Sequence, residues 1–193
     1  MRTKDETKEK KLQEATAAII LEEGAAAVST TKVAKRVGIS QSNVYLYFKN
    51  KDELLVSVYQ REIAKIQATG ELDQLLAPDV PLTQRLRDYV QGVYLFALAH
   101  PDSLTLIQQI KWLMGQVDGD PFAIIAQPNN VVRQLMQAAI DAGVIRAVPV
   151  NVHMAMVFAV LQTHTQNVKH GRYAADAYPF EALYQLIWAG MKS

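Results

Sequence analysis

The 193-residue chain contains no cysteine, which excludes disulfide bonds and thiolate metal sites. No apolar run approaches the roughly 20 residues that a membrane-spanning helix needs. The first residues, MRTKDETKEKK, lack the apolar segment of a secretory signal. From these absences we expect a cytoplasmic protein without a membrane partner.

An excess of one charge is also lacking, because 20 Lys and Arg nearly balance 19 Asp and Glu. The balance is uneven along the chain. Residues 1–65 hold 12 basic and 9 acidic residues, whereas residues 66–193 hold 8 and 10. The small positive excess of the first part permits a polyanionic partner without requiring one.

Signals of catalysis and of metal binding are missing as well. No two histidines stand three or four residues apart, so no helical metal-binding pair exists; they are His100, His153, His164 and His170. The chain has no phosphate-binding glycine loop and no nucleophile elbow. We therefore expect no enzyme and no cofactor, with each histidine on a surface or an interface, or at most hydrogen-bonded to a ligand.

Helical periodicity, in contrast, runs through almost the whole chain, and the fold class we expect is all-α. Half of the residues are hydrophobic, which is enough for a sizeable core. Ser29, Ser40 and Asn50 are candidate N-caps, and Gly24 and Gly38 are candidate helix ends. The predicted helices cover about 8–23, 30–37, 41–47, 51–69, 82–99, 101–114, 130–143, 150–169 and 180–191, with a further start at Asp120-Pro121.

Polar and aromatic side chains crowd the segment VGISQSNVYLYFKNKDELL, residues 37–55. A short helix, a turn with Gly38 and a second short helix make a helix-turn-helix, whose second helix lies in the major groove of DNA. Gln41, Ser42 and Asn43 carry groups that match base edges. Hydroxyls, helix-start amides and lysines suit phosphates, and they come from Thr30, Thr31, Tyr45, Tyr47, Lys49 and Lys51.

Two other interpretations of this segment remain open. It could be an ordinary polar surface, with Val44 and Phe48 in the core below it. It could also belong to a helical interaction module whose head binds another protein. DNA binding differs from protein binding in its steep loss of affinity with salt, because each neutralised phosphate releases counterions.

The stretch GAAAVSTTKVAKRVGISQSNVYLYFKNKDELL resembles the N-terminal head of the tetracycline-repressor (TetR) family of bacterial transcriptional regulators. The resemblance covers about residues 12–55, and it implies a three-helix DNA-binding head followed by a larger helical body that binds a ligand and dimerises. We assign residues 1–50 to the head and 51–193 to the body. Family members often have a basic residue at the position of Gln41, Gly or Pro at that of Ser42, and Thr at that of Asn43. Because this chain differs at all three positions, the operator sequence does not carry over.

The body is expected to dimerise, because one such head makes too few base contacts and two heads can read a near-palindromic operator. The resemblance implies a contact made by the last two helices of each subunit. The alternative is that these faces pack only within the subunit. The candidate interface residues are Met154, Ala155, Phe158, Ala159, Leu161, Leu183, Leu186, Ile187 and Trp188.

The resemblance also implies a pocket for a small-molecule effector among the middle helices, and a repressor that leaves its operator when the effector binds. The candidate lining is almost uncharged, which favours a neutral or hydrophobic effector. The alternative for each of these residues is plain core. The candidates are Ile66, Val93, Tyr94, Phe96, Leu106, Gln109, Ile110, Trp112, Leu113, Met136, Phe158 and Gln162.

Overall fold

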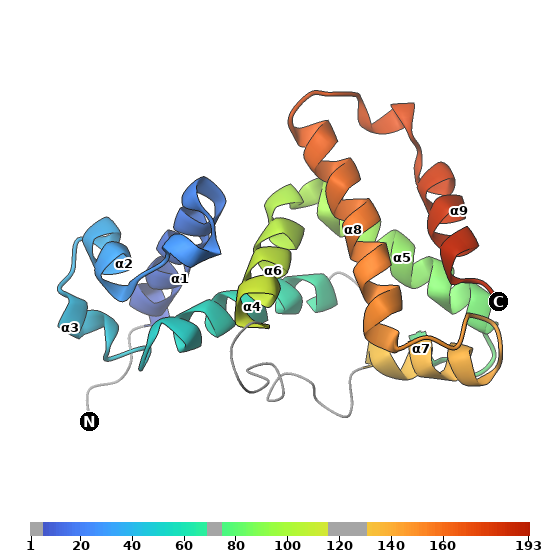
Figure 1. Ribbon diagram of the computed structural model, residues 1–193, viewed down its shortest axis with the longest axis horizontal. Coiled ribbons are helices and arrows are strands. Elements are labelled where there is room, and N and C mark those ends of the chain that lie inside the picture. Colours follow the sequence, from blue (N-terminus) through green and yellow to red (C-terminus); the bar gives the residue numbers. More distant parts are fainter. Residues whose placement is uncertain (1–5, 69–74, 116–130) are drawn as a thin grey trace. The chain divides into compact units, whose positions relative to one another are not determined.

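The computed structural model describes residues 6–68, 75–115 and 131–193, and within these ranges the chain is helical and has no strand (Figure 1). The expected all-α class is therefore confirmed. The helices are α1 (Glu6–Glu23), η1 (Ala25–Ala27), α2 (Thr30–Val37), α3 (Gln41–Val44), α4 (Lys51–Ala68), α5 (Leu82–Ala99), α6 (Pro101–Met114), α7 (Val131–Asp141), α8 (Val150–Lys169), η3 (Ala175–Ala177) and α9 (Phe180–Met191).

Most helix bounds lie within two residues of those predicted, but the helix expected over 41–47 is shorter. α3 ends at Val44, and residues 45–47 form turns. The amides of Leu46 and Tyr47 bond to carbonyls three residues back instead of four. This tightening ends the α-helical pattern while the chain still coils for one more turn. The helix start expected at Asp120-Pro121 and the end expected at Thr69 lie outside the described residues.

Local hydrogen bonds explain two of these helix starts. The Ser29 hydroxyl accepts a hydrogen bond from the backbone N–H of Lys32 at 3.1 Å, as expected of an N-cap. The Asn50 side chain accepts one from the N–H of Glu53 at 2.8 Å. The Glu53 carboxylate in turn accepts from the N–H of Lys49, which completes a variant of the capping box.

The chain divides into two compact units. The first comprises residues 1–64 and 105–125, and the second comprises residues 65–104 and 126–193. The division falls inside α4 and inside α6, so each of these helices supplies residues to both units. The domain limits assigned from the sequence, 1–50 and 51–193, stay a prediction.

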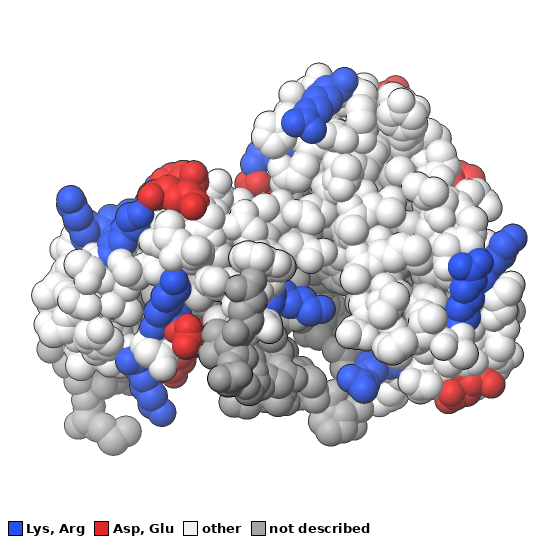
Figure 2. Space-filling model, in the orientation of Figure 1, with Lys and Arg blue, Asp and Glu red and all other residues white. Residues whose placement is uncertain are grey.

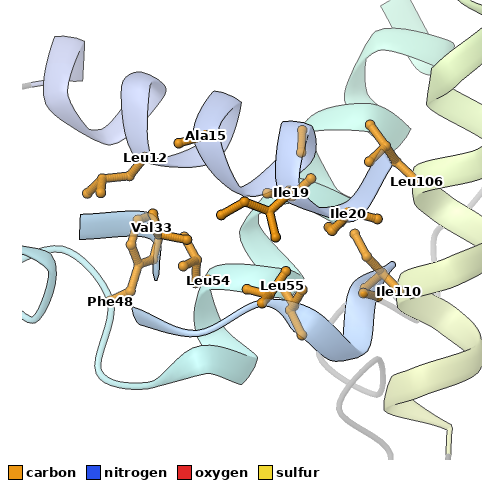
Figure 3. Packing of buried hydrophobic residues seen from close by; sticks show 14 of the residues in the cluster. Leu12, Ala15, Ile19, Ile20, Val33, Phe48, Leu54, Leu55, Leu106 and Ile110 are labelled. Carbon is orange, nitrogen blue, oxygen red and sulfur yellow. The ribbon is translucent and has the colours of Figure 1, made fainter. Parts of the chain in front are cut away.

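The first unit contains a single apolar cluster built from α1, α2, α3, α4 and part of α6. In Figure 3 the side chains of Leu12, Val33 and Phe48 meet near one end of α1, and Ile20 meets Ile110 near the other. Val44 and Phe48 are buried, as the sequence predicted. This cluster is the base on which α3 is held.

In the second unit α5 packs against α7, α8 and α9. Buried side chains recur on α8 at His153, Val157, Leu161 and His164, which is one helical stripe. Two of the four histidines are thus core residues of the subunit, and the expectation of surface or interface positions is wrong for both. The alternative expectation, a hydrogen bond to a ligand, stays a prediction.

Candidate nucleic-acid interface

The helix-turn-helix is formed by α2, the turn at Gly38 and α3 (Figure 1). Gly38 has φ +76° and ends α2, because this left-handed conformation carries little penalty only without a Cβ. Val44 anchors the inner side of α3. The three candidate base-reading residues, Gln41, Ser42 and Asn43, are all exposed on its outer side.

The candidate phosphate-binding residues differ in accessibility. Thr31 and Lys49 are exposed, and Tyr45 has half of its surface exposed. Tyr47 and Lys51 are half-buried, and Thr30 is buried. Leu46, which was not a candidate, is 59% exposed beside them and adds an apolar group to the surface.

Three candidate residues from α2, α3 and the following turn form one hydrogen-bonded group. The Gln41 side-chain amide donates to the Thr30 hydroxyl at 2.9 Å and to the Tyr45 hydroxyl at 3.2 Å. The two hydroxyls lie 3.4 Å apart. The amide nitrogen of Gln41 is engaged in this group, which leaves its carbonyl oxygen as the atom available to a base. The sequence did not indicate this arrangement.

A second group surrounds the start of α3. The Ser40 hydroxyl lies 2.8 Å from that of Ser42 and accepts a hydrogen bond from the Asn43 amide at 3.0 Å. Ser40 occupies the N-cap position, but its side chain makes no capping bond to the backbone, so that expectation was wrong in detail. The hydroxyl is used to orient neighbouring side chains instead.

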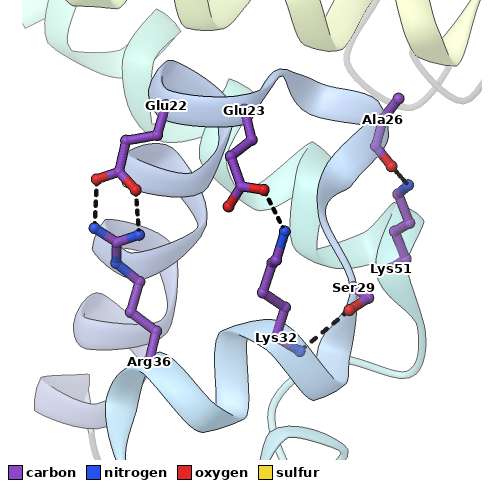
Figure 4. Close-up of polar contacts among 7 residues, drawn as sticks. All are labelled: Glu22, Glu23, Ala26, Ser29, Lys32, Arg36 and Lys51. Atoms are coloured by element: carbon purple, nitrogen blue, oxygen red, sulfur yellow. Dashed lines mark hydrogen bonds and ion pairs between the residues drawn. The ribbon is translucent and has the colours of Figure 1, made fainter.

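Ion pairs fix α2 against the end of α1, as Figure 4 shows. Arg36 makes two bonds to the Glu22 carboxylate, at 2.6 and 2.5 Å, and Lys32 pairs with Glu23 at 2.6 Å. The hydrogen bond from Arg36 lowers the pKa of the Glu22 carboxyl. Lys51 donates to the carbonyl of Ala26 at 3.0 Å, so this candidate phosphate contact also ties α4 to η1.

Charges of both signs are interspersed on the face in Figure 2. Blue and red side chains occur there in small adjoining groups, and uncharged residues cover most of the described surface in this view.

Comparison with known proteins supplies the deciding observation. The family model described as bacterial regulatory proteins, tetR family, matches residues 12–58, which hold α1, α2, α3 and the start of α4. A solved structure of a candidate transcription regulator from Lactobacillus plantarum is 56% identical. It covers 96% of this chain and 98% of its own, with a TM-score of 0.84. The chain belongs to the TetR family of transcription regulators.

Two further relatives agree with this assignment. A TetR-family transcription regulator from Marinobacter aquaeolei is 20% identical over the full length of both chains, with a TM-score of 0.76, and it shares the fold. A Haemophilus influenzae protein described as an uncharacterized HTH-type transcriptional regulator is 31% identical over 99 residues. That match spans 51% of this chain and 52% of the relative's own length.

In the body of this TetR-family regulator, the candidate interface residues do not share one environment. Leu161 and Ile187 are fully buried within the subunit. Met154, Phe158, Leu183 and Trp188 are half-buried. Ala155, Ala159 and Leu186 are exposed, and Leu186 has 61% of its surface accessible. Only the exposed and half-buried members of the set have surface to offer a partner.

The candidate pocket residues are divided between the two compact units. Leu106, Gln109, Ile110, Trp112 and Leu113 belong to the first unit, where Leu106 and Ile110 pack in the core of the head and Gln109 accepts a hydrogen bond from the N–H of Ala25 at 3.0 Å. Trp112 is 69% exposed. The second unit holds Ile66, Val93, Tyr94, Phe96, Met136, Phe158 and Gln162.

The sequence allowed His164 at most a hydrogen bond to a ligand and did not place it among the candidate pocket residues, yet the structure buries it beside two tyrosine rings. Its ring lies 5.8 Å from that of Tyr94 and 5.6 Å from that of Tyr173, measured between centroids. Burial lowers the pKa of this imidazole. The spacing of His164 from Val157 and Leu161 on α8 was a signal that could have identified it as a core position.

Across the described residues, no helix is long and apolar enough to cross a membrane. The same residues contain no group of three His, Cys, Asp or Glu side chains placed to hold a metal ion.

Proposed function

We propose that this TetR-family regulator is a homodimeric repressor of a near-palindromic operator, and that a small hydrophobic molecule releases it from DNA. The observation that carries the proposal is the two-sided character of α3. Val44 fixes its inner side in the core, while Gln41, Ser42 and Asn43 stay exposed on the outer side. A polar helix face held rigidly on an apolar base suits insertion into a major groove.

Contacts with DNA divide into two kinds. The side-chain amides of Gln41 and Asn43 read base edges, and Ser42 can bond to either kind of partner. Thr31, Tyr45, Tyr47 and Lys49 bind phosphates and set the register of the helix in the groove. Buried Thr30 and half-buried Lys51 support these contacts, since each already bonds to a neighbour within the first unit.

The dimer contact that we propose lies on the outer faces of α8 and α9. Exposed residues recur on α8 at Val152, Ala155 and Ala159, and on α9 at Ala182 and Leu186. Small residues let two helices approach closely, and the larger side chains supply apolar area. The proposed contact does not include Leu161 and Ile187, which are buried within the subunit.

Repression is the mode that we propose, because a dimer bound at a promoter blocks polymerase without a further contact surface. Release requires that the effector prefer the conformation that does not bind DNA. α4 is the element expected to transmit the change, since it supplies residues to both units. The largely uncharged candidate lining, which includes Val93, Phe96 and Met136, supports a hydrophobic effector.

A binding assay on the DNA upstream of its own gene tests the proposal. Affinity should fall steeply between low and high salt. Lys49→Ala should weaken binding to all sequences, whereas Asn43→Ala should relax preference at one base pair, at a cost of about 1–3 kcal/mol. Lys192→Ala, a change of the same charge in the body, is the control. An affinity that is insensitive to salt and to the two head substitutions would instead support a protein-binding head.

A further inference from the structure

The second unit contains a buried polar atom without a partner. His164 is 2% exposed, and its Nε2 forms no hydrogen bond within the described part of the chain. Buried polar groups in native proteins nearly always have a partner, so an unpaired one requires an explanation. His153, on the same stripe of α8, shows the usual situation, because its Nε2 is bonded to the carbonyl of Arg146 at 2.9 Å.

Two tyrosine rings, those of Tyr94 and Tyr173, lie beside His164. Phe180 extends this group, since its ring lies 5.3 Å from that of Tyr94. These rings come from α5, from the connection after α8 and from the first residue of α9, and all of them lie in the second unit. Aromatic faces therefore lie together with a few polar atoms, which is the composition typical of a small-molecule site.

We infer from a chain of hydrogen bonds which nitrogen of His164 carries the proton. Arg172, which can only donate, bonds to the Asn167 carbonyl oxygen at 2.6 Å. The Asn167 amide nitrogen therefore faces Tyr173 and donates to its hydroxyl at 3.3 Å. The Tyr173 hydroxyl in turn lies 3.3 Å from Nδ1 of His164. Because its oxygen already accepts from Asn167, we assign its own hydrogen to the bond with Nδ1. In the neutral imidazole the proton then resides on Nε2, which makes the unpaired atom a donor.

The cation that lies directly over the rings is already paired. Arg87 lies over the rings of Phe180 and Tyr184, and its guanidinium bonds to the Glu181 carboxylate at 2.7 Å. It is thus engaged by both an anion and two aromatic faces. A ligand with a carboxylate would bring a second anion to a cation that Glu181 already neutralises, so an uncharged acceptor fits better.

We propose that Nε2–H of His164 donates a hydrogen bond to a carbonyl oxygen of the effector, and that the effector is an uncharged aromatic carbonyl compound whose ring packs on Tyr94 and Phe180. This inference rests on the proposed function, in which the body binds a small molecule. It adds the chemical class of that molecule and the residue that anchors it. Tyr173 is a positioning residue, because it acts by fixing the proton on Nε2.

A titration followed by NMR of the full-length protein with ¹⁵N-labelled histidine tests this proposal. The probes are acetophenone and ethylbenzene, which differ only in the carbonyl oxygen. We expect acetophenone to bind in the millimolar range, about tenfold more tightly than ethylbenzene, the factor that one buried neutral hydrogen bond supplies. The Nε2 resonance of His164 should move, while that of His153, already bonded, should not.

Two variants separate the hydrogen bond from packing. His164→Phe keeps a flat ring and should abolish the preference for acetophenone over ethylbenzene. Tyr173→Phe leaves His164 in place but removes the donor to Nδ1, and it should reduce the preference and change the tautomer signals. The exposed His170 supplies a control, since His170→Gln should alter neither. If His164→Phe fails to fold, the Tyr173→Phe variant and the wild-type titration still test whether His164 bonds to the carbonyl oxygen of the probe.

Equal affinity of the wild-type protein for the two probes, no binding of acetophenone at millimolar concentration, or a response at His153 instead of His164 would overturn the proposal. These readouts need no DNA. A protein that binds acetophenone at His164 but never binds an operator would contradict the proposed function alone. Release from DNA by compounds that leave the His164 signal unmoved would contradict only this inference.

Discussion

At the scale of single residues, sequence specificity depends on which polar atoms remain available after the head has folded. The side-chain nitrogen of Gln41 is engaged with Thr30 and Tyr45, which leaves its carbonyl oxygen as the group available to a base. A carbonyl oxygen accepts from the exocyclic amino groups of adenine and cytosine in the major groove. We predict that selection from random duplexes will yield A or C at the base facing Gln41, and that Gln41→Leu will remove this preference. A selected G at that base in the wild-type protein would contradict the prediction.

The buried imidazole of His164 predicts a pH dependence of stability. Burial lowers its pKa in the folded protein below the ordinary value of 6.5, which the unfolded chain retains. As the pH falls from 6.5 toward the lower folded pKa, the unfolded state binds a proton that the folded state does not. The free energy of unfolding should therefore fall in that window and be independent of this group above it. Urea unfolding at several pH values from about 7 to 5 should show that the free energy of unfolding depends less on pH for His164→Phe than for the wild type. The same pH dependence in both proteins would show that this imidazole contributes nothing to it.

At the scale of elements, the turn between α2 and α3 depends on Gly38. A Cβ added there meets no atom within 4 Å, so the cost of Gly38→Ala comes only from the positive φ of 76°. We expect a loss of about 1–2 kcal/mol in the free energy of unfolding.

Gly92, inside α5, has ordinary helical φ and equally open surroundings. Gly92→Ala should therefore raise stability by roughly 0.5–1 kcal/mol. Denaturant unfolding measures both, and a stabilised Gly38→Ala variant would contradict the argument.

The elements were largely predictable from the sequence because their signals are local. Ser29 and Asn50 cap helices through bonds to residues three positions on, and such spacings can be read from the chain. The early end of α3 could not be read in this way, since the apolar pattern continues through Phe48, which the core buries. Nor could the group of Thr30, Gln41 and Tyr45, because its bonds join residues from separate elements.

The candidate pocket was less predictable than the head. An apolar stripe identifies residues that face inward but not the neighbours that they meet there. Leu106 and Ile110 illustrate this, since both were pocket candidates and both are buried in the core of the first unit. The burial of His164 was missed for a different reason. It is a polar residue on an apolar stripe, and it was expected at the surface because of its residue type, although its spacing indicated burial.

At the scale of the whole molecule, dimerisation should depend on the outer faces of α8 and α9. Leu186→Glu places a charge at the centre of the proposed contact, where it would be buried without a partner. We expect the variant to sediment as a monomer at micromolar concentration and to lose operator binding. Leu95→Glu is a matched control, because Leu95 on α5 is 57% exposed, close to the 61% of Leu186. A dimeric Leu186→Glu variant would place the contact elsewhere.

The stacking of Tyr184 on Trp188 also equips the molecule with an optical reporter. The two rings lie 6.1 Å apart and nearly parallel, and Trp188 is half-buried on α9. The chain has only one other tryptophan, the solvent-exposed Trp112. Trp112→Phe therefore leaves a single indole whose emission originates on α9, so quenching or a spectral shift would register events on that helix without any attached dye.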